Sequence, residues 1–494
     1  MPAPSYSLSI GEETSTNLPI QISWSVPGLA RHRRCALGVL TSNLVLSIWS
    51  ADAKLVDQSS WRRRLIVNDC LAEYFDTEAV QLESVLTTDE EEKLRLRTRI
   101  RSFAWAPMLP LAQAASIIGT QLTWAQHIVA VTNDDNQVVF ALVDSPTTSL
   151  GLSESWDARV LNHFSVTPDS NSIFSEIPTS FDDIMHQQRF ISHIAWSPWI
   201  MRDGSFRSVL AYSTNDDVRA RIVTYTYNTI EFGEELTFAT IDLRNNGAMK
   251  WSPGIIGGDK LILAMFAHSD LTCLTVSITD ASVLSQSSMN ADGDWGEISG
   301  IVWDHSPNLP VHLHFSSLRT TMSSATSALE VSETGSLSVL PSPNWREHIN
   351  NSRALFSIQN DLQGNVRSKV WGLCASPLGD FIATCHTLHP SDMVEYGAAA
   401  NRSSTFAING LQSANQPEIH IPTSNASAEA LMFTIRRWLE TNVEDTEHIS
   451  EFTDKVLAKV NRVYEPVETS TGVPDTAAYE SGDLAQLTRE LKCE

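Results

Sequence analysis

The stretch IAWSPWIMRDGSFRSVLAYSTNDDVRARIVTY (194–225) contains two patterns that recur along the chain. It begins with a short apolar alternation that Pro198 ends. Because proline cannot donate a hydrogen bond to a strand ladder, this pattern predicts a strand followed by a turn. Two longer alternating runs then flank a polar tip, Asn215-Asp216-Asp217. Asn and Asp tolerate the left-handed backbone of tight turns, so the second pattern predicts a β-hairpin.

The unit of strand, turn and hairpin begins six times. Hairpin-like segments at 35–49, 127–143 and 261–278 follow their motifs as 208–225 does. Repeats of one small sheet are typical of a β-propeller of the tryptophan–aspartate (WD40) type, although the usual Trp-Asp dipeptide is degenerate here. The motif starts are ISWSVP (22–27), FAWAP (103–107), IAWSP (194–198), MKWSP (249–253), IVWDHSP (301–307) and GLCASP (372–377).

These repeats predict an all-β fold, a seven-bladed β-propeller of the WD40 type. The long interval between the second and third motifs has room for a seventh blade, around HFSVTPDSNSIF (163–174). Residues 6–10 also alternate, and we expect them to close the ring by pairing with the last blade. The propeller is expected to occupy residues 1–427.

Several segments do not follow the repeat. Residues 50–100 are expected to form a helical insertion, in which a capping box at Thr88 and Glu91 starts a second helix. Residues 397–427, rich in Ala, Asn and Ser, are expected to be a flexible loop. Residues 428–494 show three helical patterns and are predicted to form a C-terminal helical appendix. The apolar positions on one face of the first insertion helix are Trp61, Leu65, Ile66, Cys70, Tyr74 and Phe75; those of the first appendix helix are Leu431, Met432, Ile435, Trp438 and Leu439.

The overall charge argues against direct binding of nucleic acid. Lys and Arg number 34 against 58 Asp and Glu, which gives a net charge of −24 and repels a phosphate backbone. The basic stretches at 31–34 (RHRR) and 62–64 (RRR) are short and are expected to be solvated surface. Six scattered cysteines lack a disulfide framework, no signal peptide is visible, and the apolar run 261–267 is too short to span a bilayer. We expect an intracellular protein that does not enter a membrane.

The segment VWGLCASPLGDFIATCHTLHPSDMVEY (370–396) has the residue types of a zinc site but not the spacing. Ten residues lie between Cys374 and Cys385, whereas zinc ligands usually come in pairs two to four residues apart. Only Cys385 and His389 meet that spacing. We therefore expect two strands of a blade, 370–375 and 381–386, with both cysteines as small buried hydrophobic residues.

Other groups of chemically active residues are incomplete. Asp304, His305 and Ser306 are adjacent in the chain and cannot act as a catalytic triad. His312 and His314 share a strand face, but no third metal ligand is evident. The glycine-rich GIIGGDK (254–260) lacks the end of a phosphate loop, and RNNGAM (244–249) falls one residue short of an acetyl-coenzyme A loop. We therefore predict no catalytic, cofactor-binding or metal-ligating residues, and no cofactor.

Two stretches resemble a known family. RCALGVLTSNLVLSIWSADAKL (34–55) and 370–396 are similar to the N-terminal propeller of the delta-type subunit of general transcription factor IIIC, and the similarity extends over about residues 18–396. That family belongs to the nuclear complex that recognises internal promoters of transfer-RNA genes and helps to place the initiation factor for RNA polymerase III. In the family the propeller contacts other subunits, and a different subunit reads the DNA.

The resemblance implies a non-catalytic scaffold subunit in the nucleus, with other transcription factor IIIC subunits and initiation-factor components as partners and DNA reached only through them. Two alternatives stay open. One is the histone acetyltransferase activity associated with the family, and the other is a WD40 adaptor of another complex, such as a ubiquitin ligase. The family continues into a cysteine-rich, zinc-binding module, so Cys493 is either its first ligand or unrelated to it.

Overall fold

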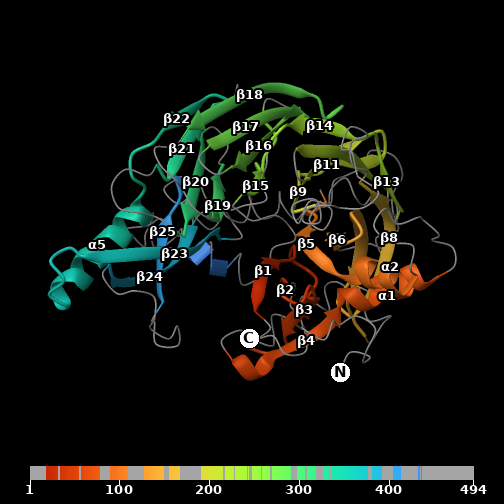
Figure 1. Ribbon diagram of the computed structural model, residues 1–494, viewed down its shortest axis with the longest axis horizontal. Helices are drawn as coiled ribbons and strands as arrows, with labels where there is room; N and C mark the ends of the chain where they lie inside the picture. The colour runs from red at the N-terminus through yellow and green to blue at the C-terminus, as the bar shows by residue number, and fades with distance from the viewer. Residues whose placement is uncertain are drawn as a thin grey trace, which may run out of the picture.

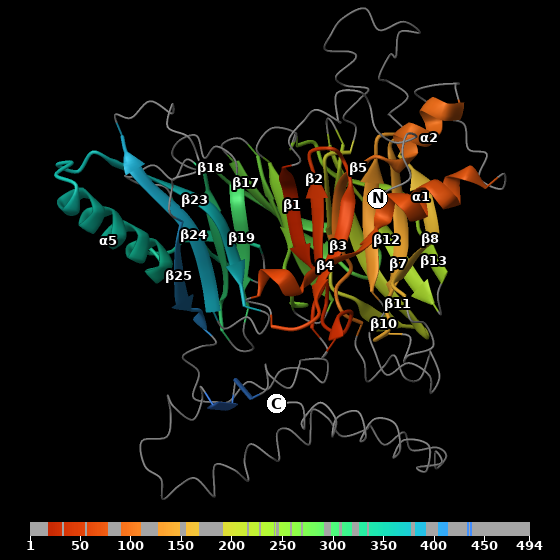
Figure 2. The same ribbon diagram turned by 90° about the horizontal axis from the view of Figure 1, so that it is seen from below.

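Six antiparallel sheets stand around a common centre in the computed structural model, as the blades of a β-propeller (Figures 1 and 2). We number them blades 1 to 6 in chain order. The structure describes residues 18–31, 34–54, 57–77, 90–109, 127–148, 155–166, 191–214, 217–226, 229–241, 243, 247–256, 259–267, 270–290, 298–305, 309–318, 326–332, 335–376, 381–391, 404–412, 432–433 and 435–436.

The first three blades contain the first three motifs as their innermost strands. Blade 1 is β1 (Pro19–Trp24), β2 (Leu37–Thr41), β3 (Leu46–Ala51) and β4 (Trp61–Ile66); blade 2 is β5 (Ile100–Trp105), β6 (Ile128–Asn133), β7 (Gln137–Asp144) and β8 (Asp157–Ser165); blade 3 is β9 (His193–Trp196), β10 (Ile200–Arg202), β11 (Ser205–Ser213), β12 (Val218–Thr226), β13 (Thr229–Phe232) and β14 (Leu236–Ala239). In blade 3 the strands β9 and β10 both pair with β11, and β13 and β14 both pair with β12, so the inner and outer strands are each interrupted once.

The last three blades follow the same order from the centre outward. Blade 6 has three strands in the described part of the chain, one fewer than blades 4 and 5. Blade 4 is β15 (Ala248–Trp251), β16 (Lys260–Phe266), β17 (Asp270–Ser277) and β18 (Val283–Asn290); blade 5 is β19 (Ile298–Asp304), β20 (Val311–Ser317), β21 (Ala328–Val331) and β22 (Leu337–Val339); blade 6 is β23 (Val366–Ala375), β24 (Phe381–Pro390) and β25 (Thr405–Gly410).

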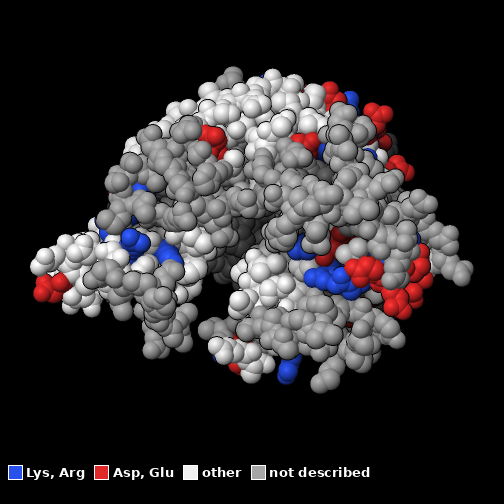
Figure 3. Space-filling model, in the orientation of Figure 1, with Lys and Arg blue, Asp and Glu red and all other residues white. Residues whose placement is uncertain are grey.

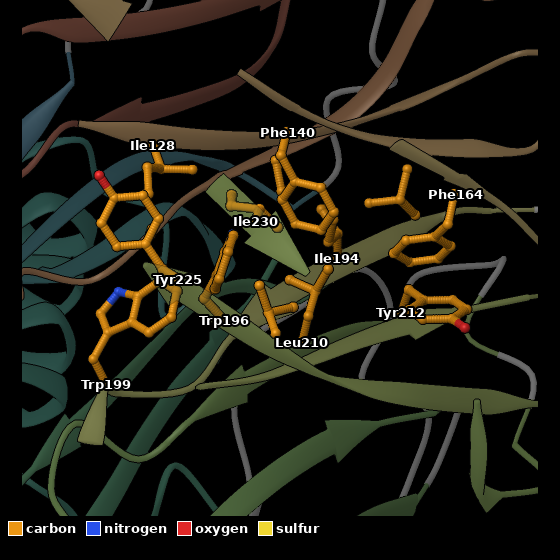
Figure 4. Close-up of a cluster of buried hydrophobic side chains, with 14 of the residues drawn as sticks. Ile128, Phe140, Phe164, Ile194, Trp196, Trp199, Leu210, Tyr212, Tyr225 and Ile230 are labelled. Carbon is orange, nitrogen blue, oxygen red and sulfur yellow. The ribbon is translucent and has the colours of Figure 1, made fainter. Parts of the chain in front are cut away.

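Apolar cores fill the spaces between neighbouring blades. Figure 4 shows the core between blades 2 and 3, where Phe140 and Phe164 from blade 2 meet Trp196 and Tyr212 from blade 3. Each large side chain buried in this way contributes about 1.5 to 3 kcal/mol relative to an exposed one. Clusters of the same kind join blades 1 and 2, 3 and 4, 4 and 5, and 5 and 6. The described structure thus has five interblade cores for six blades.

A tryptophan near the end of the inner strand in blades 1 to 5 explains part of this packing. The indole N–H of Trp251 in blade 4 donates to the carbonyl oxygen of Ala195 in blade 3, at 3.1 Å. That of Trp303 in blade 5 donates to the carbonyl oxygen of Lys250 in blade 4, at 3.3 Å. In these blades the tryptophan of the repeat therefore points back to the preceding blade.

Three helices of eight or more residues complete the described structure. The first, α1 (Val67–Asp76), and the second, α2 (Glu90–Thr98), lie beside blades 1 and 2 (Figure 1). The third, α5 (Asn344–Gln359), runs between blades 5 and 6, with Trp345 and Ile349 in their shared core. Among the described residues, no helix is both long and apolar enough to cross a membrane.

The sequence predictions need four corrections. In the described part of the chain the propeller has six blades and not seven, because each of the six motifs starts one sheet and none is left over. Residues 163–165, expected in a seventh blade, belong to β8 of blade 2, and residues 6–10 lie outside the described part. Residues 61–66, expected to be helical, form β4, and 405–410, expected to be loop, form β25. The helix α5 was not predicted, although Trp345 and Ile349 have helical spacing.

Candidate docking surfaces

The first candidate surface, the insertion helix α1, is already occupied by the propeller itself. Its apolar residues Val67, Leu71 and Phe75 are buried in the core between blades 1 and 2. The side chain of Asn68 fixes the start of the helix, because its amide donates to the carbonyl oxygens of Leu44 and Thr98. The apolar face of residues 61–75 suits burial against either a partner protein or the propeller, with a partner as the expectation from sequence, and the structure instead buries the helix on the propeller.

An ion pair attaches the second helix of the insertion to blade 2. Arg97 of α2 donates from Nε to Oδ2 of Asp135 at 2.8 Å, and both side chains are almost fully buried. The guanidinium also lies 5.4 Å from the centre of the Phe75 ring. Asp134, next in the same hairpin tip, pairs with Arg99 and Arg101. The predicted helix at this position is confirmed, and it is part of the propeller surface.

The second candidate surface is the outer face of blade 1. Alternate residues of β1, together with Leu18 just before it, point away from blade 2 and are exposed. Trp24 is the clearest case, because the same position in blades 3, 4 and 5 holds a buried tryptophan that faces the preceding blade. Trp24 is 54% exposed, whereas Trp251 and Trp303 are 3% and 5% exposed. The exposed residues of this face are Leu18, Ile20, Ile22 and Trp24.

The third candidate surface is the corresponding face of blade 6. Its other face packs on α5 and blade 5, with Val370, Leu373 and Ile382 buried. On the side away from blade 5, Phe406 is 70% and Ile408 is 68% exposed. They lie opposite Cys385 and Ala383 in the β24–β25 ladder. Trp371 of β23 is also half exposed, so this sheet face is apolar and uncovered in the described structure.

The two uncovered faces border one opening of the ring. Figure 1 shows blades 1 and 6 separated, while every other blade has a neighbour on each side. The space-filling view shows a hollow between the left and lower parts of the molecule (Figure 3). A further hollow of about 580 Å³ lies at the inner ends of blades 1 to 4 and is lined mainly by tryptophan, proline and methionine side chains.

Three residues with metal-binding side chains come together in blade 5. Asp304 of β19 lies directly opposite His312 of β20, and the ligand atoms of Asp304, His312 and His314 lie within 4.8 Å of one another. The spacing of the two histidines in the sequence indicates no third ligand. The signal was present, because the β19–β20 hairpin brings Asp304 into register with them.

Hydrogen bonding disfavours metal binding at this cluster. The indole N–H of Trp345 donates to Nδ1 of His314 at 3.4 Å, so the proton of the neutral ring is on Nε2, facing Oδ2 of Asp304 at 3.9 Å. Burial, with a smaller contribution from His312, lowers the pKa of His314 to about 4, so the ring is neutral at pH 7. The backbone N–H of Gln412 donates to Asp304. We interpret the cluster as a polar joint that holds the end of blade 6 on blade 5.

The cysteine and histidine segment forms two strands of blade 6, as predicted. The strands β23 and β24 run longer than expected, and 377–380 lie outside the described part. One expectation is wrong: Cys374 is exposed and Cys385 is only half-buried, because their sheet face borders the opening. His386 points to the opposite, buried face. Among the described residues, the side chains of Cys374, Cys385, His386 and His389 do not gather as a metal site.

The glycine-rich segments form no phosphate site in the described structure. Ile256 and Lys260 form an antiparallel β-bridge where the chain passes from β15 to β16. The segment 244–249 leads into the strand β15, with 244–246 outside the described part, as is Ser306. Of the basic stretches, 62–64 lies on the strand β4, where Arg64 pairs with Asp52.

The fold defines a six-bladed β-propeller, and the described residues show no assembled catalytic group. A family model for the β-propeller domain of transcription factor IIIC subunit delta matches residues 1–411. The chain therefore belongs to the family of transcription factor IIIC delta subunits. This confirms the resemblance that its first and last blades suggested.

Other comparisons add little. No curated protein matches the chain. Among solved structures, the β-propeller domain of Vanderwaltozyma polyspora Nup133 is 9% identical, with a TM-score of 0.31, over 61% of this chain and 70% of that one. The propeller of Dos1 is also 9% identical, with a TM-score of 0.36, over 77% and 79% of the two chains. Similarities this low carry no argument about function.

Proposed function

We propose that this chain is a non-catalytic scaffold subunit of transcription factor IIIC, which holds other subunits together for transcription of transfer-RNA and similar genes by RNA polymerase III in the nucleus. Membership of the delta-subunit family is the observation that carries the proposal. The proposal assigns DNA recognition to companion subunits, in keeping with the net charge of −24.

The uncovered apolar faces support a role in assembly. Monomeric proteins rarely expose large contiguous apolar patches, and such patches usually mark interaction sites. Residues 428–494 are the second proposed attachment region. Their amphipathic pattern requires burial on the propeller or on a partner. The described part of this segment consists of 432–433 and 435–436, which are helical, with Met432 and Phe433 exposed.

The family-associated acetyltransferase activity is the alternative function of another class. It would require a site for acetyl-coenzyme A, and neither the sequence of 244–249 nor the strand that follows it provides one. Acetylation of histones by the purified chain, lost on mutation of a residue in that chain, would favour this alternative. Stable capture of ubiquitin-ligase subunits instead would favour an adaptor of another complex.

The test of the scaffold proposal uses the full chain with an affinity tag. The tagged chain is isolated from nuclear extract and its companions are identified by mass spectrometry. We expect the other transcription factor IIIC subunits at constant ratios, and extract depleted of the chain should lose transcription of a transfer-RNA gene until the purified complex is added back. Recovery of the chain without those subunits would contradict the proposal.

Two further measurements refine this test. Deletion of 428–494 should leave a folded propeller that retains fewer companions, and the substitution Ile435→Asp should act in the same direction. Retention of every companion would assign the contacts to the blades alone. The isolated chain should bind duplex DNA weakly, without sequence preference and with loss at moderate salt. Tight promoter binding at physiological salt would refute the proposed division of labour.

A further inference from the structure

The opening of the ring is a gap in a repeated packing scheme. Five interblade cores bury their apolar residues, and the sixth pair of faces, on blades 1 and 6, has none in the described structure. Seven of the exposed large hydrophobic side chains in the described residues lie on these two faces or directly before β1. They are Leu18, Ile20, Ile22, Trp24, Trp371, Phe406 and Ile408.

The geometry restricts what can cover both faces at once. The two faces belong to two separate sheets that border the same opening (Figure 1). A segment that contacts both must be apolar on both sides, as strands buried between layers are. Within this protein such strands contain unbroken apolar runs, for example 138–143 (VVFALV) and 261–267 (LILAMFA).

The charge of the two blades adds a second restriction. The strands of blades 1 and 6 contain five Arg or Lys residues and no Asp or Glu. They are Arg62, Arg63, Arg64, Arg367 and Lys369. Asp52, just outside β3, pairs with two of the arginines of β4. Arg63, opposite Trp49 in the β3–β4 ladder, and the exposed Arg367 of β23 lie on the two faces at the opening. In a chain with a net charge of −24 this local positive charge favours an acidic occupant.

The chain's own remaining segments fit these two restrictions poorly. Neither 1–17 nor 413–494 contains five consecutive apolar residues. The longest run, 430–433, includes Met432 and Phe433, which are helical in the described structure. A second copy of the chain, bound face to face, would place the same basic strands against these faces. Both restrictions therefore point to a different protein.

We propose that the opening between blades 1 and 6 binds a β-strand segment of a companion subunit that is apolar on both faces and flanked by acidic residues. The segment forms strands that hydrogen-bond to one another between the two faces, because the backbone groups of blades 1 and 6 lie in the planes of their own sheets. Its apolar side chains contact the exposed residues of both faces. This inference rests on the proposed scaffold function, because it assigns one subunit contact to a defined surface.

The test places a photo-crosslinking amino acid at Ile22 in blade 1 or at Phe406 in blade 6 of the full tagged chain, isolated in its complex. Both side chains are more than half exposed, so neither replacement disturbs a core. We expect crosslinks from both positions to the same acidic, strand-forming peptide of one companion subunit. Leu355 of α5, which is 59% exposed on another surface, is the control position and should not crosslink to that peptide.

Substitutions measure whether the contact contributes to assembly. The double variant Phe406→Asp/Ile408→Asp should reduce retention of that companion at least tenfold, and Arg63→Glu/Arg367→Glu should reduce it severalfold. The control variants Leu355→Asp and Arg202→Glu change an exposed leucine and a half-exposed arginine far from the opening. They should retain the companion. Unchanged circular dichroism and unfolding midpoints establish that the variants fold.

Several outcomes would overturn the inference. Crosslinks from Ile22 or Phe406 to residues 1–17 or 413–494, or from one blade to the other, would show that the chain covers these faces itself. Crosslinks to a second copy, or none above the control, would exclude the proposed occupant. In each case companions that still purify with the chain keep the scaffold proposal intact, whereas loss of all companions from the unmodified chain refutes that proposal first.

Discussion

The buried ion pair between Arg97 and Asp135 tests whether the helical insertion is part of the propeller. The substitution Arg97→Leu removes the guanidinium that lies 2.8 Å from Asp135, whose side chain is 2% exposed. Breaking one partner of such a pair leaves an uncompensated buried charge and costs about 3 to 5 kcal/mol. For a chain of this size, whose unfolding entropy is about 0.9 to 1.0 kcal/mol/K, we expect the thermal unfolding midpoint to fall by about 3 to 6 °C.

A double variant and a surface control make this prediction specific. Arg97→Leu combined with Asp135→Asn removes both charges and should recover at least about 1 kcal/mol of the loss. Arg95, which pairs with the partly exposed Glu92 on the same helix, is the control. Its replacement by Leu should cost less than about 1 kcal/mol, because exposed pairs contribute little. Equal effects of Arg97→Leu and Arg95→Leu, measured by thermal and urea unfolding, would refute the assignment of α2 to the propeller.

Three other predictions follow from particular residues. A Cβ at Gly300 would lie 2.6 Å from backbone atoms of Leu373, so Gly300→Ala should force blades 5 and 6 apart and lower the free energy of unfolding by about 1 to 3 kcal/mol. A Cβ at Gly372 would meet no atom within 4 Å, so Gly372→Ala should be tolerated. Equal unfolding midpoints for the two variants would contradict this. A thiol-labelling reagent should modify the exposed Cys374 rapidly and spare the buried Cys273, because burial raises the pKa of the Cys273 thiol to about 12. The labelling rates are measured by mass spectrometry, and similar rates for the two cysteines would be inconsistent with the strand faces described above. Burial lowers the pKa of His127 to about 3, so the folded state binds fewer protons than the unfolded state below pH 6.5, and stability is lost as the pH falls from 6.5 towards 3. By pH 5 this loss amounts to about 2 kcal/mol, and His127→Leu should unfold with a correspondingly weaker acid dependence; an identical dependence in both proteins would exclude this role.

The repeated motif explains how much of the fold is predictable from sequence. Each inner strand ends in a turn signal, and these local patterns do not depend on distant contacts. All six motifs therefore start a blade, and the paired strands of the hairpins and α2 also follow the prediction. The seventh blade was wrong because it was inferred from a long interval and not from a motif of its own.

The errors within segments also have physical causes. Residues 61–66 show an apolar spacing that fits a helix, but they pair with β3 and become the outer strand of blade 1. Residues 405–410 have little apolar pattern, and pairing with β24 makes them a strand. Since pairing partners lie far away in the sequence, such segments adopt their structure from tertiary context.

The sequence by itself determined the repeat, the number of motif starts, the family and the acidity of the chain. Tertiary structure alone decided that α1 packs on the propeller of the same chain, that Asp304 lies beside His312 and His314, and that Cys374 is exposed. It also decided where the ring is open, because exposure depends on whether a neighbouring blade is present and not on the residue. Trp24 and Trp251 occupy the same position of the same motif, and only the packing of the blades leaves the first exposed and the second buried.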